Sequence, residues 1–382
     1  MRWLNKGYES SSFVSRFNEL QSVYIYGAAT VGLSLYETLT DYLNIQVLGF
    51  IDRKGSKFTE DGSLNGIPVF SPKILSEIQG NSIVLIGAGM IKDISQTLLS
   101  YGFQRNVDFF VGNEFITMYM LEKKEKVYLF SLCIMITEFC TFSCEKCGNL
   151  LPHYKNPSHR PISQIMRDLD NFFDYTDYLS LLAITGGDAM AHPQSARILE
   201  LIGEKYLGTR IGRISFASNA IILPDEHLLN LLKRYNVIYR ITDYKTAKQK
   251  ISETINLLRQ NDITYDIITL EHWLDIGFPQ ESNNIKNDDA LIRFADNCHR
   301  ALCEYLCNNR YYKCGMVHFA ERAGWCIPEP NDSYDLSIKP NQNHKREFAE
   351  FSIGFSEKGY YTVCQKCNGW YGVNQLKISV GT

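Results

Sequence analysis

Cys140, Cys144 and Cys147 form the most informative pattern in this 382-residue chain, in the run Cys-Thr-Phe-Ser-Cys-Glu-Lys-Cys. The spacing C-x3-C-x2-C gathers three thiolates on one short loop. Thiolates are ligands for iron, and three of them can hold three irons of a [4Fe-4S] cube while the fourth iron stays open to a small molecule. An open iron would support chemistry as well as electron storage.

Three other interpretations of this trio fit less well. Zinc takes four ligands and usually shows paired C-x2-C units, so the loop is one ligand short. A disulfide framework is typical of secreted chains, and the start of this sequence at Met1 has no signal-type apolar segment. Buried structural cysteines are the third interpretation, and it suits Cys133, inside an apolar strand-like run, better than it suits the loop.

A second motif, Gly186-Gly187-Asp188, follows the cysteine loop and ends an apolar strand-like run. Glycines let a backbone approach a ligand closely, and a carboxylate can accept hydrogen bonds from an ammonium group. Taken alone, the motif fits equally an ordinary strand-to-helix turn in which Asp188 caps a helix.

With the strand-like run Tyr128–Thr137 before it and the Gly-Gly-acid segment after it, the cysteine loop resembles that of the radical S-adenosylmethionine (radical SAM) superfamily. The resemblance implies a [4Fe-4S] cluster whose open iron binds SAM. One electron would then cleave SAM to a 5′-deoxyadenosyl radical, which abstracts hydrogen from a substrate. The protein would position and shield the reactants, because the hard chemistry belongs to the cofactor.

The resemblance also implies which residues contact SAM. Where the family carries Gly-Gly-Glu, this chain has Gly186, Gly187 and Asp188, with an acid one methylene shorter. Ser218 and Asn219 match a Thr-Asn-Gly segment that contacts the ribose or carboxylate of SAM. Serine and asparagine at strand ends are also common turn formers, so a structural role stays open for this pair.

Lys146 marks a departure from the family, which usually places an aromatic residue before the third cysteine, against the adenine of SAM. Adenine contact is therefore expected from elsewhere, with Phe142 or a later strand as the candidates.

The composition indicates a globular enzyme in the cytoplasm. Hydrophobic residues make up 45% of the chain and charged residues 21%, and the formal net charge of −3 gives no electrostatic footprint for nucleic acid. The longest apolar stretch is far shorter than the roughly 18 residues of a membrane span. We expect neither a nucleic-acid partner nor a membrane span.

Residues 1–121 contain no cysteine and are predicted to form a Rossmann-like domain with a parallel sheet, because a strand, a glycine turn, a helix and a second strand follow in order. Ala29 stands where the fingerprint G-x-G-x-x-G needs its second glycine, which disfavours NAD. The segment resembles small domains attached to bacterial sugar-modifying and glycan-assembly enzymes. A nucleotide or nucleotide-sugar site and an empty structural or dimerising domain stay equally open.

Residues 122–290 repeat strand and helix and are predicted to form the radical SAM core. The resemblance implies a partial (βα)6 barrel, with its active site at the carboxyl ends of the strands. Arg240, Asp243 and Tyr244 end one such strand and are candidates for substrate contact. A buried structural ion pair is the alternative.

Residues 291–382 hold seven of the eleven cysteines and resemble the SPASM and twitch domains of radical SAM enzymes, with a left-handed hairpin turn expected at Asn308-Asn309. The resemblance implies an auxiliary [4Fe-4S] cluster in a small C-terminal domain, and structural zinc is the alternative. Cys303 is the substitute for the first ligand, while Cys307 and Cys326 are expected to be packing residues. The preferred ligands are Cys298, Cys314, Cys364 and Cys367.

These resemblances imply a radical SAM enzyme that oxidises or rearranges a sugar, nucleotide-sugar or cyclitol, with electrons supplied by a reductase such as flavodoxin or ferredoxin. A peptide-modifying maturase is one alternative, although no peptide-docking winged helix is evident. A non-catalytic iron-sulfur or zinc-binding protein is another. No catalytic base or hydrogen donor can be assigned, and Trp273, Asp275 and His318 are candidates only.

Overall fold

The structure is a computed structural model, and it describes residues 22–53, 62–79, 82–278, 283, 285, 287–298 and 304–379. The described chain forms two compact units, one that ends at Lys126 and one that begins at Val127. The predicted boundary after residue 121 falls inside helix α5 (Gly112–Lys124). The predicted core and tail segments belong to the same compact unit.

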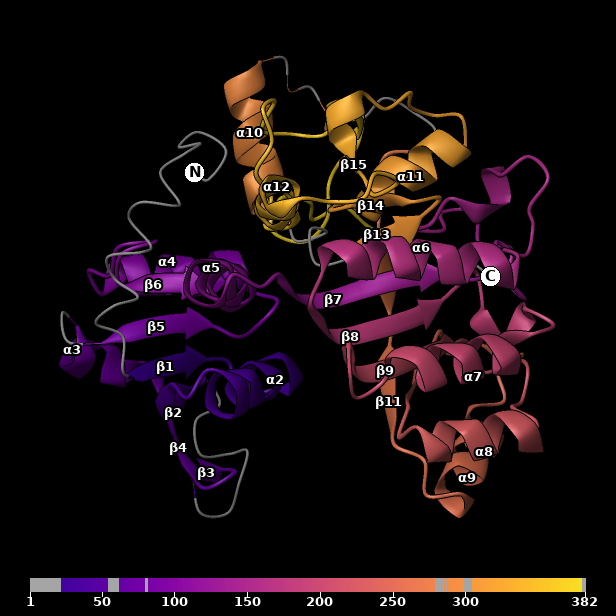
Figure 1. Ribbon diagram of the computed structural model, residues 1–382, viewed down its shortest axis with the longest axis horizontal. Helices are drawn as coiled ribbons and strands as arrows, with labels where there is room; N and C mark the ends of the chain where they lie inside the picture. The colour runs from indigo at the N-terminus through magenta and orange to yellow at the C-terminus, as the bar shows by residue number, and fades with distance from the viewer. Residues whose placement is uncertain are drawn as a thin grey trace. The chain divides into compact units, whose positions relative to one another are not determined.

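The N-terminal unit is built on one sheet with the strand order β3-β4-β2-β1-β5-β6 (Figure 1). All pairings in it are parallel except β3 with β4, which confirms the predicted Rossmann-like parallel sheet. The strands are β1 (Ser22–Tyr26), β2 (Gln46–Ile51), β3 (Ser63–Leu64), β4 (Ile67–Phe70), β5 (Ile83–Ile86) and β6 (Phe109–Val111). The helices are α2 (Thr30–Glu37), which continues as the π-helical segment Thr38–Tyr42, then α3 (Leu75–Ile78), α4 (Ile91–Ser100) and α5.

The glycines of the first turn are explained by packing within this unit. Gly27 has a φ of +122°, and a Cβ there would lie 2.6 Å from the carbonyl oxygen of Gly87. A Cβ on Gly32 would overlap the carbonyl oxygen of Gly27. These glycines therefore let helix α2 approach the ends of β1 and β5, a requirement that holds without any nucleotide.

The second unit is built on an eight-stranded sheet with the order β11-β10-β9-β8-β7-β13-β14-β15. Strands β7 to β11 are mutually parallel, with a helix between each pair, which confirms the predicted parallel α/β fold of the core. These strands are β7 (Tyr128–Met135), β8 (Tyr178–Thr185), β9 (Ile211–Ser218), β10 (Ile238–Asp243) and β11 (Tyr265–Thr269). The helices are α6 (Ile162–Tyr175), α7 (Ser195–Tyr206), α8 (Glu226–Arg234) and α9 (Ile251–Gln260).

The sixth parallel strand of this sheet comes from the tail. Strand β13 (Tyr305–Cys307) pairs in parallel with β7, on the side of β7 that faces away from β8. It turns back into β14 (Arg310–Tyr312), which pairs with β15 (Tyr334–Asp335). Asn308 and Asn309 have φ angles of 54° and 56°, which confirms the predicted left-handed hairpin turn.

The rest of the tail surrounds this hairpin. Its helices are α10 (Asp288–Asn297), α11 (Gly315–Arg322) and α12 (Gln342–Ser352). A separate two-stranded antiparallel sheet joins β12 (His272–Leu274) to β16 (Lys377–Ser379), so one segment of the tail reaches the chain that follows β11.

The apolar stripes of the helices cover this second sheet as expected from their 3.6-residue spacing. On α6 the buried side chains include Ile165, Leu169 and Phe172. Asp225 begins α8, because its side chain accepts a 2.8 Å hydrogen bond from the backbone N–H of Leu228. The strand ends that carry the site are therefore fixed by ordinary helix-on-sheet packing.

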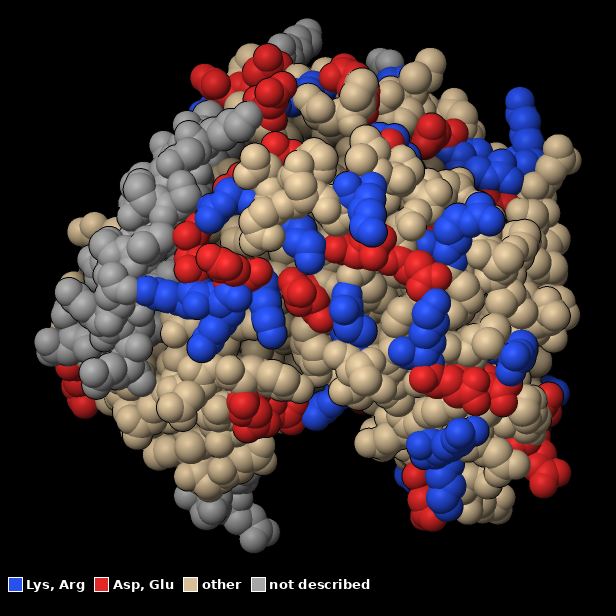
Figure 2. Space-filling model, in the orientation of Figure 1, with Lys and Arg blue, Asp and Glu red and all other residues tan. Residues whose placement is uncertain are grey.

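Charged side chains of both signs are interspersed on the face of the molecule seen in Figure 2, and neither sign forms one continuous patch there. Among the described residues, no helix has the length and apolar character needed to cross a membrane.

Candidate functional site

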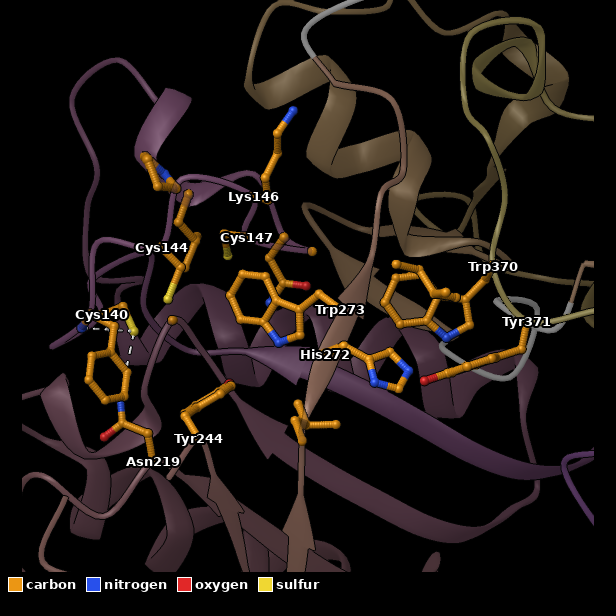
Figure 3. Close-up of a pocket in the computed structure, with 18 residues that line it drawn as sticks. Cys140, Cys144, Lys146, Cys147, Asn219, Tyr244, His272, Trp273, Trp370 and Tyr371 are labelled. Atoms are coloured by element: carbon orange, nitrogen blue, oxygen red, sulfur yellow. Dashed lines mark hydrogen bonds between the residues drawn. The ribbon is translucent and has the colours of Figure 1, made fainter. Parts of the chain in front are cut away.

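The three loop cysteines line a single cavity at the carboxyl ends of the parallel strands (Figure 3). Their loop follows β7 directly, and Cys144 is buried while Cys140 and Cys147 are half-buried. The loop is stabilised by its own hydrogen bonds, from the N–H of Cys147 to the carbonyl of Cys144 at 3.0 Å and from the N–H of Phe142 to the Sγ of Cys140 at 3.5 Å.

Burial acts strongly on two of these thiols. It raises the pKa of Cys140 to about 12 and that of Cys144 to about 11, and the charges of neighbouring thiolates act in the same direction. Thiolates here would thus need a bound cation for stability, as metal ligation supplies. Three thiols that line one cavity match the donors of a [4Fe-4S] cube, because each thiolate of a cube binds a separate iron. The donor set therefore fits a cluster.

Gly186 and Gly187 hold this loop against the end of β8. The N–H of Gly187 donates to the carbonyl of Thr137 at 2.9 Å. A Cβ on Gly187 would overlap the carbonyl of Phe139 and lie 2.8 Å from the Cβ of Cys140, and a Cβ on Gly186 would lie 2.8 Å from Cγ2 of Thr137. The two glycines thus have a local role, because the cysteine loop packs directly on their Cα atoms.

Asp188 is a buried carboxylate at the same strand end, only 2% exposed. Its Oδ1 accepts a 3.0 Å hydrogen bond from the N–H of Met190, so it caps the short 3-10 helix Ala189–Ala191, and its Oδ2 accepts from the N–H of Asn219 at 3.4 Å. Burial raises the pKa of Asp188 to about 6, against the opposing effect of these hydrogen bonds. The capping role considered for this residue is therefore present in the structure.

Ser218 and Asn219, at the end of β9, have different roles. The Oγ of Ser218 accepts a 3.0 Å hydrogen bond from the N–H of Ala220 and stabilises the turn. Asn219 lines the cavity, and its side-chain amide donates to the Oγ1 of Thr141 at 2.7 Å and lies 3.8 Å from the Sγ of Cys140. Asn219 thus belongs to the cysteine site, whereas Ser218 has the turn-forming role.

Aromatic side chains make most of the wall opposite the cysteines (Figure 3). The ring of Tyr244 lies edge-on to those of Phe142 and Trp273, with centroids 5.4 and 5.9 Å away. Phe142, one predicted source of adenine contact, therefore lies in the cavity. Lys146 also lines it, and its ammonium donates to the carbonyl of Phe278 at 3.1 Å.

Other candidates from the sequence fall elsewhere. Of Arg240, Asp243 and Tyr244, only Tyr244 is among the described residues that line the cavity. Arg240 lies 3.6 Å from Asp266 of the neighbouring strand, but this ion pair is partly exposed and is therefore not the buried pair considered as the alternative. Trp273 does line the cavity.

Two further polar candidates also lie away from the cysteine loop. The backbone carbonyl of Asp275 accepts hydrogen bonds from the side chains of Asn368 and Asn374. His318 faces a different cavity, beside Tyr312 and Arg322.

Among the residues of the cavity wall that sequence reasoning missed are His272, Trp370 and Tyr371. His272 lies on β12, and the other two come from a turn in the tail. The only available signal was the aromatic pair shortly after the C-x2-C motif, which has no periodic pattern to mark it.

The four tail cysteines predicted as ligands of a second site stay a prediction, and the structure shows three of them close to the fourth. Cys364 is buried in the short helix Thr362–Gln365, and burial, followed by the nearby Cys314, Cys298 and Cys367 thiols, raises its pKa well above the ordinary value. Cys298 ends α10 and Cys314 begins α11. The predicted substitute Cys303 lies outside the described residues.

Cys307 and Cys326 are the two cysteines expected to be packing residues. Cys307 is buried in β13, and Cys326 is half-buried beyond α11.

No family model matches the chain, and no curated protein matches it. Among solved structures, the chain is similar to BtrN in complex with AdoMet and 2-DOIA, with a TM-score of 0.44 and 14% identity over 63% of this chain and 94% of that one. It is similar to anSMEcpe with bound AdoMet and a Cp18Cys peptide, with a TM-score of 0.31 and 15% identity over 37% of this chain and 43% of that one. It is also similar to Streptococcus suis SuiB bound to S-adenosylmethionine, with a TM-score of 0.28 and 13% identity over 53% of this chain and 51% of that one.

This chain spans less than half of the anSMEcpe chain that it matches.

Proposed function

We propose that this chain is a radical SAM enzyme. The observation that carries the proposal is that Cys140, Cys144 and Cys147 line one cavity together with Gly187 and Asn219. Such a cavity offers three iron ligands and a fourth side that is open to SAM. A [4Fe-4S] cluster with SAM would supply one-electron cleavage of SAM and hydrogen abstraction from a substrate.

The chain's own residues would position these partners. Gly187 would let the loop that carries Cys140 pack against the end of β8. Asp188 is not among the described residues that line the cavity, and its carboxylate would hold the ends of β8 and β9 together through the hydrogen bonds that it accepts from Met190 and Asn219. The amide of Asn219 would fix the loop that carries the first cysteine. Phe142 and Tyr244 would exclude water from one side of the cavity.

We further propose a sugar, nucleotide-sugar or cyclitol as substrate. Aromatic faces such as those of Trp273 and Trp370 are suited to cover one face of a ring, while His272 and Asn149 offer polar contacts. None of the described residues lining the cavity is Asp or Glu, and Lys146 is the charged one among them. This lining favours an uncharged or anionic ring over a cationic one.

For the tail we propose an auxiliary [4Fe-4S] cluster held by Cys298, Cys314, Cys364 and Cys367. A small reductase such as flavodoxin or ferredoxin would supply electrons. The support is the burial of Cys314, Cys364 and Cys367, together with the closeness of the other three thiols to Cys364. A zinc ion is the competing occupant, and metal analysis separates the two.

The test is iron and sulfide content after anaerobic reconstitution, combined with 5′-deoxyadenosine formation from SAM under reduction. The wild-type chain is compared with one in which Cys140, Cys144 and Cys147 are all alanine, and Cys326→Ala is the matched control. We expect two clusters to fall to one, and 5′-deoxyadenosine to disappear, only in the triple variant. Iron near zero in all three proteins, with zinc in its place, would contradict the proposal.

A further inference from the structure

The tail cysteines and the cysteine-loop cavity are connected by one short segment, Asn368–Ser379, which we call the strap. Trp370 and Tyr371 of the strap line the same cavity as the loop cysteines. Figure 3 shows them on the far side of the cavity from Cys140 and Cys144. The strap begins directly after Cys367, the last of the four tail cysteines.

Two consecutive amides of the strap donate hydrogen bonds to cysteine sulfurs. The N–H of Gly369 donates to the Sγ of Cys367 at 3.2 Å, and the N–H of Trp370 donates to the Sγ of Cys298 at 3.2 Å. Hydrogen bonds to an anionic acceptor are roughly twice as strong as neutral ones. A metal that keeps these sulfurs as thiolates would therefore hold the backbone of Trp370 in place.

The other end of the strap is bound to the segment that follows β11. Asn374 is buried, and its side-chain amide donates to the carbonyls of Asp275 at 2.8 Å and Gly369 at 3.0 Å. Its Oδ1 accepts from the N–H of Leu376 at 2.8 Å. The N–H of Asp275 donates in return to the carbonyl of Leu376 at 2.8 Å.

The strap then pairs as β16 with β12, with Ile378 opposite Trp273. Two aromatic parts of the cavity wall thus belong to one hydrogen-bonded assembly: Trp273 on β12 and the turn with Trp370 and Tyr371. This assembly is connected to the tail cysteines through Gly369 and Trp370. The amide of Asn283 adds hydrogen bonds to the carbonyls of Cys364 and Cys367.

We propose that the tail cysteine site has a positioning role in addition to metal binding: when it is loaded, it fixes the strap and so completes the wall of the cavity. Gly369 and Trp370 are the positioning residues, and they act through their backbone amides. The proposal rests on the proposed function only in treating the cavity as the reaction site. It holds for iron-sulfur or zinc, because both keep cysteine sulfur as thiolate.

The test is hydrogen–deuterium exchange of the full chain, read for residues 368–379 by mass spectrometry. The reconstituted wild-type protein is compared with Cys364→Ser/Cys367→Ser, and Cys326→Ser is the matched control. We expect exchange in the strap to be about tenfold faster in the double variant and unchanged in the control. Equal exchange of the strap in all three proteins would overturn the proposal.

A second variant guards against general misfolding of the double variant. Asn374→Ala leaves every cysteine in place but removes the three hydrogen bonds of the Asn374 side chain, including the one that anchors the strap to Asp275. We expect it to keep the metal content of the wild type and to exchange faster in residues 368–379 alone. A loss of metal together with unchanged strap exchange would show that the strap is not held in this way.

Neither readout depends on turnover, so this proposal and the proposed function can fail separately. Absent 5′-deoxyadenosine with a strap that still responds to tail metal would remove the function and keep the positioning role.

Discussion

The side-chain amide of Asn219 lies 3.8 Å from the Sγ of Cys140 and donates a 2.7 Å hydrogen bond to the Oγ1 of Thr141. The end of β9 therefore holds the first part of the cysteine loop, although the two segments are far apart in sequence. We expect Asn219→Ala to lower the free energy of unfolding by about 1 kcal/mol and to reduce the iron bound at the loop.

The measurements are chemical denaturation of the metal-free chain and iron content after reconstitution. Asn261→Ala is the matched control, because its amide donates at 2.8 Å to the carbonyl of Leu257 at the end of a helix. Equal iron content in the two variants would remove Asn219 from the cysteine site.

The cysteine loop packs so closely on Gly187 that this position has no room for a side chain. We expect Gly187→Ala to displace Phe139 and Cys140, because the new Cβ would overlap the carbonyl of Phe139. Iron at the loop should be lost while tail metal is kept, as measured by metal analysis. Gly324→Ala is the control: it introduces strain at a φ of +73° with nothing within 4 Å of the new Cβ. A full iron complement in Gly187→Ala would contradict this packing argument.

Substitutions of Phe142 and Lys146 are expected to differ in their effect on the affinity for SAM. If Phe142 contacts the adenine, Phe142→Ala should weaken SAM binding by about three- to tenfold, the usual contribution of one aromatic contact. Lys146→Met should leave it unchanged, because the ammonium is bound to the carbonyl of Phe278. Equilibrium dialysis of the reconstituted proteins measures both. A larger effect from Lys146→Met would transfer the adenine contact to that residue.

His318 makes stability depend on pH. Burial, aided by the charge of Arg160, lowers the pKa of His318 to about 4, whereas in the unfolded chain it is about 6.5. Between these values the unfolded chain binds more protons, so the stabilisation is complete above pH 6.5 and is lost as the pH falls to about 4.

Wild type should therefore lose about 3 kcal/mol more than His318→Phe between pH 7 and pH 4, an order-of-magnitude figure. Denaturation of the metal-free proteins at several pH values measures this difference. Parallel pH profiles for the two proteins would contradict it.

The sequence was most informative where spacing within a few residues decides the chemistry. Cys140, Cys144 and Cys147 line one cavity, and Gly187 lies against their loop, because both motifs end neighbouring parallel strands. The tail ligands Cys298, Cys314, Cys364 and Cys367 were predicted from a resemblance, and this set stays a prediction, although the first, second and fourth of these thiols lie near enough to Cys364 to act on its pKa.

The other residues of the site are placed by pairing between strands far apart in the sequence, which a local sequence pattern does not predict. Trp370 and Tyr371 reach the cavity because β16 pairs with β12, and such edge pairing has no signature in a three-residue strand. Asp188 could be read as a ligand contact or a cap, and only the hydrogen bond from Met190 establishes the cap. The pairing of β13 with β7 was also not predicted, because β13 is a three-residue strand whose pairing has no local sequence pattern.

The pairing of β13 with β7 determines how a protein without its C-terminal segment should behave. The N–H of Cys133 in β7 donates at 2.8 Å to the carbonyl of Glu304, and β13 continues the pairing along β7. A fragment cut after residue 290 would expose one side of an apolar inner strand, with a row of unsatisfied N–H and C=O groups. Such edges recruit other chains, so the shortened protein should aggregate instead of remaining a smaller folded monomer.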